Sequence, residues 1–239
     1  QGQMGLSEEV VIPISSAMQH IFEEGTAVSY NCDGIQSINL AGAIEFGREL
    51  LLPLNEEGNV IEGTVRADYE TEVVELQDWT LEIESFNHPF TVPGLVGFSM
   101  DAQNLILDQS TTKTPQQADK PALWTGIYLG NLAITFPDFF QKNGNSVIKN
   151  IENFTLDKNG VSGTIGPFEN LVASNENDVS GWPISVDNFS ITLENNNLDG
   201  VSVTGGLQLP IAETDLGYTA SIAQAENPED PLEMQFSVS

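Results

Sequence analysis

Basic residues are scarce in this sequence, and their scarcity narrows the classes of partner. Seven Lys and Arg stand against 35 Asp and Glu among 239 residues, which gives a net charge of −28. We expect no nucleic acid partner, because binding of phosphates depends on basic side chains and on the counterions that they displace. An anionic membrane surface is disfavoured for the same reason. The carboxylates favour a solvated, self-repelling surface that keeps the protein soluble, with divalent cation binding as the alternative.

Cysteine and histidine are also scarce. Cys32 is the only cysteine, so no disulfide can form within the chain. It stands in the segment NCDG without a neighbouring histidine, which favours a buried or incidental thiol over a nucleophile. His20 and His88 lack partners nearby in the sequence, and Pro89 favours a loop at His88. A triad of either histidine with Cys32 and Asp33 has nothing in its favour, and a zinc site lacks ligands.

Several familiar signatures are missing. No apolar run reaches the length of about 18 residues that a membrane span needs, so we expect no membrane insertion. The sequence holds no G-x-S-x-G elbow, no P-loop and no G-x-G-x-x-G fingerprint. It begins with Gln1 and shows no signal peptide, so we expect a mature form or a piece of a longer protein.

Alternation of apolar and polar residues is abundant and predicts an all-β protein. A period of two puts one apolar face on each strand, and roughly a dozen such runs occur. Long helical segments between them are missing, which disfavours a parallel sheet. We therefore predict an antiparallel β-sandwich or an elongated two-sheet stack of hairpins, with very little helix. The one helix expected covers 15–24, where Ala17, Ile21 and Phe22 share a helical face.

The pattern also predicts a core and its turns. Six residues of the later runs should point inward: Phe154, Leu156, Ile165, Phe189, Ile191 and Leu193. Asparagine and glycine mark turns, because both tolerate positive φ; such turns are expected at 55–59, 141–145, 157–160 and 195–200. Proline cannot donate to a β-ladder, so the runs at 10–14, 50–54 and 207–211 should end strands or lie at sheet edges.

The chain reads as one continuous β-rich region over 1–239. Residues 109–121 (QSTTKTPQQADKP) contain no large apolar side chain and are expected to form a long loop or linker. A subdivision there would separate 1–108 from 122–239. Hairpin-like segments recur on both sides of the linker without a fixed period, which is a weak internal repeat.

These segments carry a resemblance. They are WTGIYLGNLAITFPDFF at 124–140, NFTLDKNGVSGTIG at 153–166, GWPISVDNFSITLENNNLDGVSVTGGLQLPI at 181–211 and LGYTASI at 216–222. Their order resembles β-rich modules of very large, repeat-built bacterial proteins, some of them associated with contractile injection systems. The resemblance covers most of 79–222 and rests on structural motifs: aromatic strand starts, hairpin glycines and edge prolines. It implies a structural role and no catalytic residues.

The segment NNNLDG contains three candidate metal ligands. Asn195, Asn197 and Asp199, followed by Gly200, match the first half of a calcium loop. The twelfth position is Gly206 instead of a bidentate glutamate, and strand-like runs flank the loop instead of helices. A hairpin turn is favoured, and calcium at these three residues is the alternative; no other cofactor is indicated.

Carbohydrate chemistry is the remaining alternative. Among 35 acids, some pair will have the spacing of glycosidase carboxylates by chance, so the count is uninformative without a cleft. Trp79, Trp124 and Trp182 could stack on sugars, but core positions at strand starts are favoured.

The sequence thus favours a non-catalytic structural or binding module of a larger, extracellular or exported bacterial protein, partnered by neighbouring modules or other proteins. A cargo or effector of a contractile injection system is the first alternative. A carbohydrate-active enzyme or carbohydrate-binding module is the second.

Charge leads to a first prediction. Self-repulsion at a net charge of −28 should destabilise the folded state at low ionic strength, and salt screens it. The melting temperature should therefore rise when sodium chloride is increased from dilute buffer to marine-like concentration, as followed by circular dichroism. A flat or falling curve would mean that the carboxylates are spaced or paired well enough to have no effect.

Overall fold

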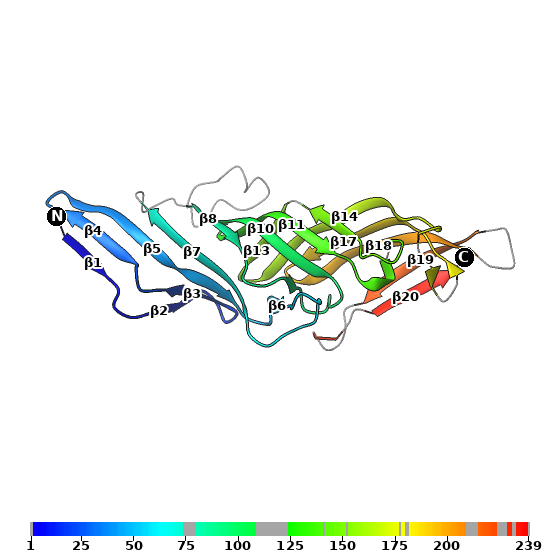
Figure 1. Ribbon diagram of the computed structural model, residues 1–239, viewed down its shortest axis with the longest axis horizontal. Coiled ribbons are helices and arrows are strands. Elements are labelled where there is room, and N and C mark those ends of the chain that lie inside the picture. Colours follow the sequence, from blue (N-terminus) through cyan, green and yellow to red (C-terminus); the bar gives the residue numbers. More distant parts are fainter. Residues whose placement is uncertain are drawn as a thin grey trace.

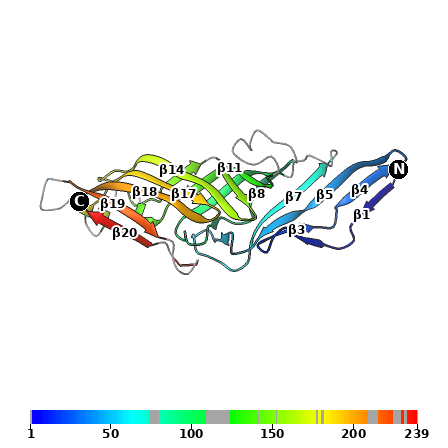
Figure 2. The same ribbon diagram turned by 180° about the vertical axis from the view of Figure 1, so that it is seen from behind.

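The computed structural model describes residues 2–73, 80–108, 124–140, 142–151, 153–176, 178–179, 182–208, 215–223, 229–230 and 233–238. These residues form an all-β protein built on two antiparallel sheets, the larger of which curls into a half-barrel. The predicted fold class is confirmed. Figure 1 shows an elongated molecule with β1 and β20 at opposite ends of its long axis, and Figure 2 shows the same arrangement from behind.

The first sheet has six strands, and the longest of them lies at its centre. Its strands are β1 (Gly2–Gly5), β2 (Val10–Pro13), β3 (Met18–Phe22), β4 (Ala27–Asn31), β5 (Gly34–Phe46) and β7 (Val65–Val73). β5 pairs with β7 along one side, and with β4 and then β3 along the other. β1 and β2 pair with β4 and β3, so they form the outer edge of this sheet.

The second sheet has twelve strands, in the order β20-β19-β18-β17-β14-β13-β11-β10-β9-β6, with β12 also on β11 and β8 also on β10. Its strands are β6 (Leu52–Pro53), β8 (Thr80–Ser85), β9 (Phe90–Thr91), β10 (Ser99–Asp108), β11 (Gly126–Thr135), β12 (Ile148–Ile151), β13 (Phe154–Asp157), β14 (Gly160–Val172), β17 (Val186–Glu194), β18 (Asn197–Gln208), β19 (Asp215–Ala223) and β20 (Glu233–Val238). A short ribbon of β15 (Asp178–Val179) and β16 (Trp182–Pro183) and one 3-10 turn, η2 (Asp138–Phe140), complete the described elements.

The predicted core is confirmed. All six residues named from the alternation are at most 2% exposed: Phe154, Leu156, Ile165, Phe189, Ile191 and Leu193. Phe189 lies among the rings of Phe136 and Phe140, with centroids 4.9 and 5.2 Å away. Edge-to-face aromatic contacts of this kind stabilise a core beyond the area that they bury.

The expected helix at 15–24 is wrong, because its centre is strand β3. Met18, His20 and Phe22 lie opposite Phe46, Ile44 and Gly42 of β5, a pairing that sequence periodicity cannot reveal. An isolated helix of about ten residues is marginal in water, whereas a neighbouring strand satisfies the backbone of the whole segment.

Edge prolines are confirmed at two of the three positions. Pro13 closes β2 at the edge of the first sheet, and Pro53 closes β6 at the end of the second. Pro210 lies outside the described residues, as does the whole expected linker at 109–121. The strands on either side of that linker, β10 and β11, are paired neighbours, and the subdivision at 109–121 stays a prediction.

The two sheets join at a cluster of phenylalanines. Phe46 at the end of β5 contacts Phe86, which in turn contacts Phe90 of β9, with ring centroids 5.6 and 5.3 Å apart. Most of the first sheet extends beyond the second sheet (Figure 1). Side chains along its β1 and β2 edge are exposed, whereas Tyr69 and Val73 of β7 are buried.

Candidate functional site

The segment NNNLDG forms a hairpin turn between β17 and β18. Glu194 pairs with Asn197, which leaves Asn195 and Asn196 as a two-residue turn with φ of 52° and 64°. Positive φ at both central residues is the requirement of a type I′ turn, and asparagine meets it at little steric penalty. The turn therefore precedes Gly200, which is not among the described glycines with positive φ and lies in β18.

Asn196 is more than a turn residue, because its side chain bonds to two other segments of the chain. Its Oδ1 accepts a 2.7 Å hydrogen bond from the Val161 backbone N–H, and its Nδ2 donates to the Leu50 carbonyl at 2.9 Å. Its backbone N–H donates to the Val161 carbonyl at 3.0 Å. One side chain thus ties the β17–β18 hairpin to the β13–β14 hairpin and to the segment before β6.

The three candidate calcium ligands lie in and just after this turn. Asn195 is exposed, and Asn197 donates its amide to the Asn195 carbonyl at 3.0 Å. Asp199 falls at the register shift between β17 and β18. No group of three or more His, Cys, Asp or Glu that could hold a metal occurs in the described part of the chain. Calcium binding here stays a prediction, which melting with calcium against a chelator tests.

His20 is buried in an aromatic contact, away from any nucleophile. Its ring stacks on Phe22 at 4.4 Å, and its Nε2 is hydrogen-bonded to the Tyr69 hydroxyl. Burial lowers the pKa of His20 to about 4. Burial also raises the pKa of Tyr69, so this hydroxyl keeps its proton and donates to a neutral imidazole. The pair is a satisfied internal hydrogen bond.

The triad of His20, Cys32 and Asp33 is excluded by distance. His20 lies beside Ile44, whereas Cys32 occupies the turn before Gly34, ten residues away along β5. At about 3.3 Å per residue this separates the two by ~30 Å. Cys32 is exposed, and the expected loop at His88 is confirmed between β8 and β9.

One cavity of the described residues opens where the second sheet splits. Thr155 pairs with Ser162, so continued pairing would place Asn153 opposite Thr164 and Ile151 opposite Gly166. Instead β14 leaves β13 and pairs only with β17, and Asn153 has a φ of 66° that interrupts the strand line. The opening has a volume of about 570 Å³ and is called the seam.

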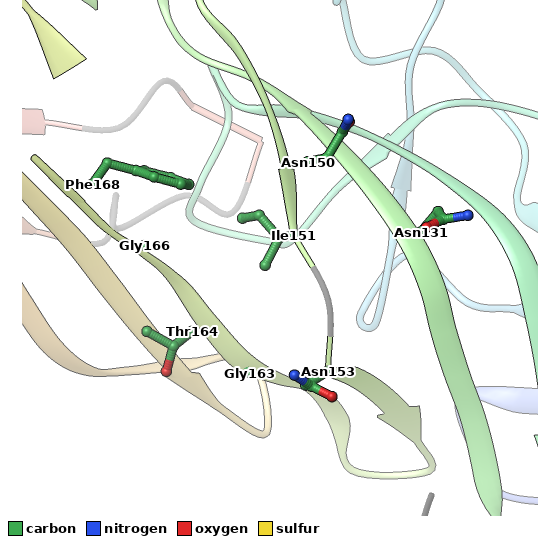
Figure 3. Close-up of a pocket in the computed structure, with 8 residues that line it drawn as sticks. All are labelled: Asn131, Asn150, Ile151, Asn153, Gly163, Thr164, Gly166 and Phe168. Carbon is green, nitrogen blue, oxygen red and sulfur yellow. The ribbon is translucent and has the colours of Figure 1, made fainter.

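Amide side chains and one ring line the seam. Figure 3 shows Asn131 and Asn150 on one side, facing Thr164 and Phe168 of β14 on the other. The lining residues include no carboxylate, histidine or cysteine: they are Asn131, Asn150, Ile151, Asn153, Gly163, Thr164, Gly166 and Phe168. General acid–base catalysis needs a titratable group within hydrogen-bonding reach, so these side chains can bind a neutral polar ligand without transforming it. The sequence pattern had not singled out any of them.

The tryptophans divide between structure and surface. Trp124 donates its indole N–H to Asp157 at 2.9 Å and stacks near Tyr128, which is a structural arrangement. Trp182 is 41% exposed in β16, so its expected core position is wrong. Trp79 lies outside the described residues.

The outstanding surface feature is an apolar face on the first sheet. Its large side chains are exposed or half-buried beyond the phenylalanine junction, and they define what we call the open apolar face: Met4, Val10, Ile12, Val28, Tyr30 and Ile38. Met4 is 68% and Tyr30 46% exposed. Sequence alternation placed apolar residues on one face of these strands, but alternation cannot tell a covered face from an uncovered one.

Comparisons of the chain with protein-family models, curated proteins and solved structures found no match. Among the described residues, no helix is long and apolar enough to cross a membrane. Function therefore has to be inferred from the side chains themselves.

The bonds of Asn196 give a second prediction. Asn196→Gly keeps the backbone freedom that a φ of 64° requires but removes the amide, and it should lower the free energy of unfolding by about 1–3 kcal/mol, since two backbone groups lose their partner. Asn197→Gly is the matched control at the next position, where the amide bonds only to carbonyls of its own turn. Urea unfolding of both proteins measures the difference. Equal losses would mean that the Asn196 amide is not a structural tie.

The buried imidazole gives a third prediction. An unfolded histidine binds its proton near pH 6.5, whereas folded His20 does so only near 4, so the free energy of unfolding falls as the pH drops through this window. The loss approaches about 3 kcal/mol and levels off below pH 4. The His20→Gln variant lacks the titrating imidazole, so its stability does not fall in this window for the same reason. The difference between wild type and variant in the free energy of unfolding, measured with urea, should therefore shrink from pH 7 to pH 4. A constant difference would contradict burial of a neutral imidazole.

Proposed function

We propose that this chain is a non-catalytic structural or binding module of a larger exported bacterial protein, and that the open apolar face is its docking surface. The bacterial and exported setting is supported by the resemblance to repeat-built bacterial modules and by a net charge of −28 without paired cysteines. The docking role is carried by a single observation: exposed apolar side chains gathered on one face of a sheet.

The placement of titratable side chains supports a role without catalysis. In the described residues, His20 is bonded to Tyr69, Cys32 is exposed ~30 Å away along β5, and the seam has no titratable lining group. Nucleophilic and acid–base mechanisms need such groups within hydrogen-bonding reach of one another. In the described parts of the chain His20 and Cys32, the candidate base and nucleophile, lie far apart.

The exposure of the face supports docking. Soluble monomers rarely present large contiguous apolar patches, and such patches mark interaction surfaces. β2 is unusual because all four of its residues, Val10–Pro13, are exposed. An apolar strand at a sheet edge favours contact with another protein, and the carboxylates of this chain keep such a surface soluble until it is covered.

Carbohydrate binding remains the second candidate, because the seam sets amides beside the ring of Phe168. Amide groups and an aromatic face suit neutral hydroxylated ligands. This role would be independent of the open apolar face.

Adjacent residues of β2 allow a direct test of docking competence, which is the fourth prediction. Ile12 and Val11 are 49% and 46% exposed but alternate to opposite faces. At micromolar protein in dilute buffer, an environment-sensitive hydrophobic dye should bind to the wild type and to the Val11→Thr variant. It should bind markedly less to the double variant Ile12→Thr, Tyr30→Thr. The single and the double variant should keep the melting temperature of the wild type, whereas Ile44→Thr, in the covered part of the same face, should lower the free energy of unfolding by about 2–4 kcal/mol.

Two results would contradict the proposal. The first is a wild type that does not bind the dye. The second is a loss of stability in the Ile12→Thr, Tyr30→Thr protein as large as that in Ile44→Thr, because the face would then be covered by the chain itself.

A further inference from the structure

Apolar side chains fill successive cross-strand rows of the open apolar face. Residues directly opposite in antiparallel strands point to the same side. Three of the rows that cross this sheet hold only apolar side chains and glycine: Met4–Val28–Ile38–Val73, Gly2–Tyr30–Ile35 and Val10–Phe22–Gly42–Tyr69. The row of Ile12 contains the neutral His20, and Leu40 lies opposite Thr71. The glycines do not interrupt the rows, because Tyr30 lies against Gly2 and Tyr69 against Gly42. The face is thus apolar across the width of the sheet.

Charge is segregated to the opposite side of the same strands. The strands of this sheet contain four carboxylates, and all four alternate away from the open apolar face: Glu45, Asp68, Glu70 and Glu72. Arg66 lies on that far side too, bonded to Asp68 and Glu23. A chain with a net charge of −28 therefore has one extended face without a strand carboxylate.

The covered part of the face shows how such a surface is satisfied. Ile44, Phe46 and Val65 lie on it and are fully buried, and Phe46 reaches Phe86 across the junction of the two sheets. Face-to-face packing of sheets about 10 Å apart buries both apolar sides. The first sheet extends beyond the second (Figure 1), and the side chains toward its β1 and β2 edge, Met4, Tyr30 and Val10, lack the layer that covers the inner ones. Tyr69 and Val73, at the β7 end of the rows, are buried.

We propose that a second copy of this chain supplies that layer, packed face to face about a two-fold axis. This deepens the docking role proposed above and rests on it. A two-fold interface needs one patch that complements itself, and this face does, because it carries no carboxylate from its strands and its exposed side chains at the β1 and β2 edge are apolar. The four strand carboxylates of each copy would stay on the outside of the pair, where salt screens them. A strongly basic partner would be drawn instead to the acidic surfaces.

The face is broad, because its exposed apolar side chains run along the outer edge of the sheet from Met4 of β1 and Tyr30 of β4 to Val10 and Ile12 of β2. A standard interface buries about 800 Å² on each partner, which is the area that the second copy has to cover. Glu8 and Glu9 between β1 and β2, and Asp33 at the β4–β5 turn, border the face, so association should strengthen as salt screens the copies from one another.

Sedimentation equilibrium with two matched pairs of variants tests this, and it is the fifth prediction. Wild type should dimerise more tightly as sodium chloride rises. Ile12→Glu and Met4→Glu place a charge on the face and should weaken the dimer by at least about tenfold, since an unpaired charge would be buried. Val11→Glu and Gln3→Glu place it on the opposite side of the same strands and should leave the dissociation constant within about threefold, because exposed charges contribute little.

Labelling adds an independent readout. Cys32 is the single, exposed cysteine, so a spin label there should give a dipolar signal between two copies in wild type and none in Ile12→Glu.

A dimer weakened equally by Ile12→Glu and Val11→Glu would overturn the face-to-face arrangement in favour of pairing through the β2 edge. A wild type that stays monomeric at all salt concentrations would overturn the second copy. If that monomer still binds the hydrophobic dye, the docking surface stands with a different partner; if it does not, both proposals fail.

Discussion

The ring contacts that run from Phe46 through Phe86 to Phe90 join the two sheets, and the rest of the molecule depends on apolar burial of this kind. No disulfide is available, and four ion pairs join the described residues: Arg48–Glu229, Arg66–Glu23, Arg66–Asp68 and Lys142–Glu176. Exposed ion pairs contribute little. No Lys or Arg follows Lys158 in the sequence, so β14 and β17 to β20 form no ion pairs among themselves. Ladders, core packing and side-chain hydrogen bonds such as those of Asn196 hold them against the repulsion of their own carboxylates.

The same junction explains why part of the first sheet is bare. β5 is 13 residues long, and only its last residues, around Ile44 and Phe46, reach the phenylalanine cluster. Its first residues carry β4 and β1 outward as a single layer. Where a strand extends beyond the core, its exposed part must either be polar on both faces or bury its apolar face against another surface. This sheet keeps its apolar alternation to the end, which favours the second outcome.

Sequence reasoning predicted the parts of the fold that depend on period two. Leu156 and Ile191 are buried because alternation aims them inward wherever their strands pair. It failed where pairing decides: β3 was expected as a helix because Ala17, Ile21 and Phe22 share a helical face, whereas in the strand Ile21 and Phe22 point to opposite sides of the sheet. It also failed for Asn196, since a turn residue gives no sign of the hairpin against which its amide will pack. The seam arises from a strand that leaves its neighbour, and the open apolar face from a layer that ends early; neither is encoded by local spacing.

The position of the first and last strands has a mechanical meaning. β1 and β20 lie at opposite ends of the long axis (Figure 1), whereas the termini of many domains lie close together. Any segment joined before β1 would therefore be held away from any segment joined after β20 by the length of the two sheets. Copies linked in series would add their lengths, as rigid spacers do. A fold with adjacent termini would add little to the length of a chain into which it was inserted.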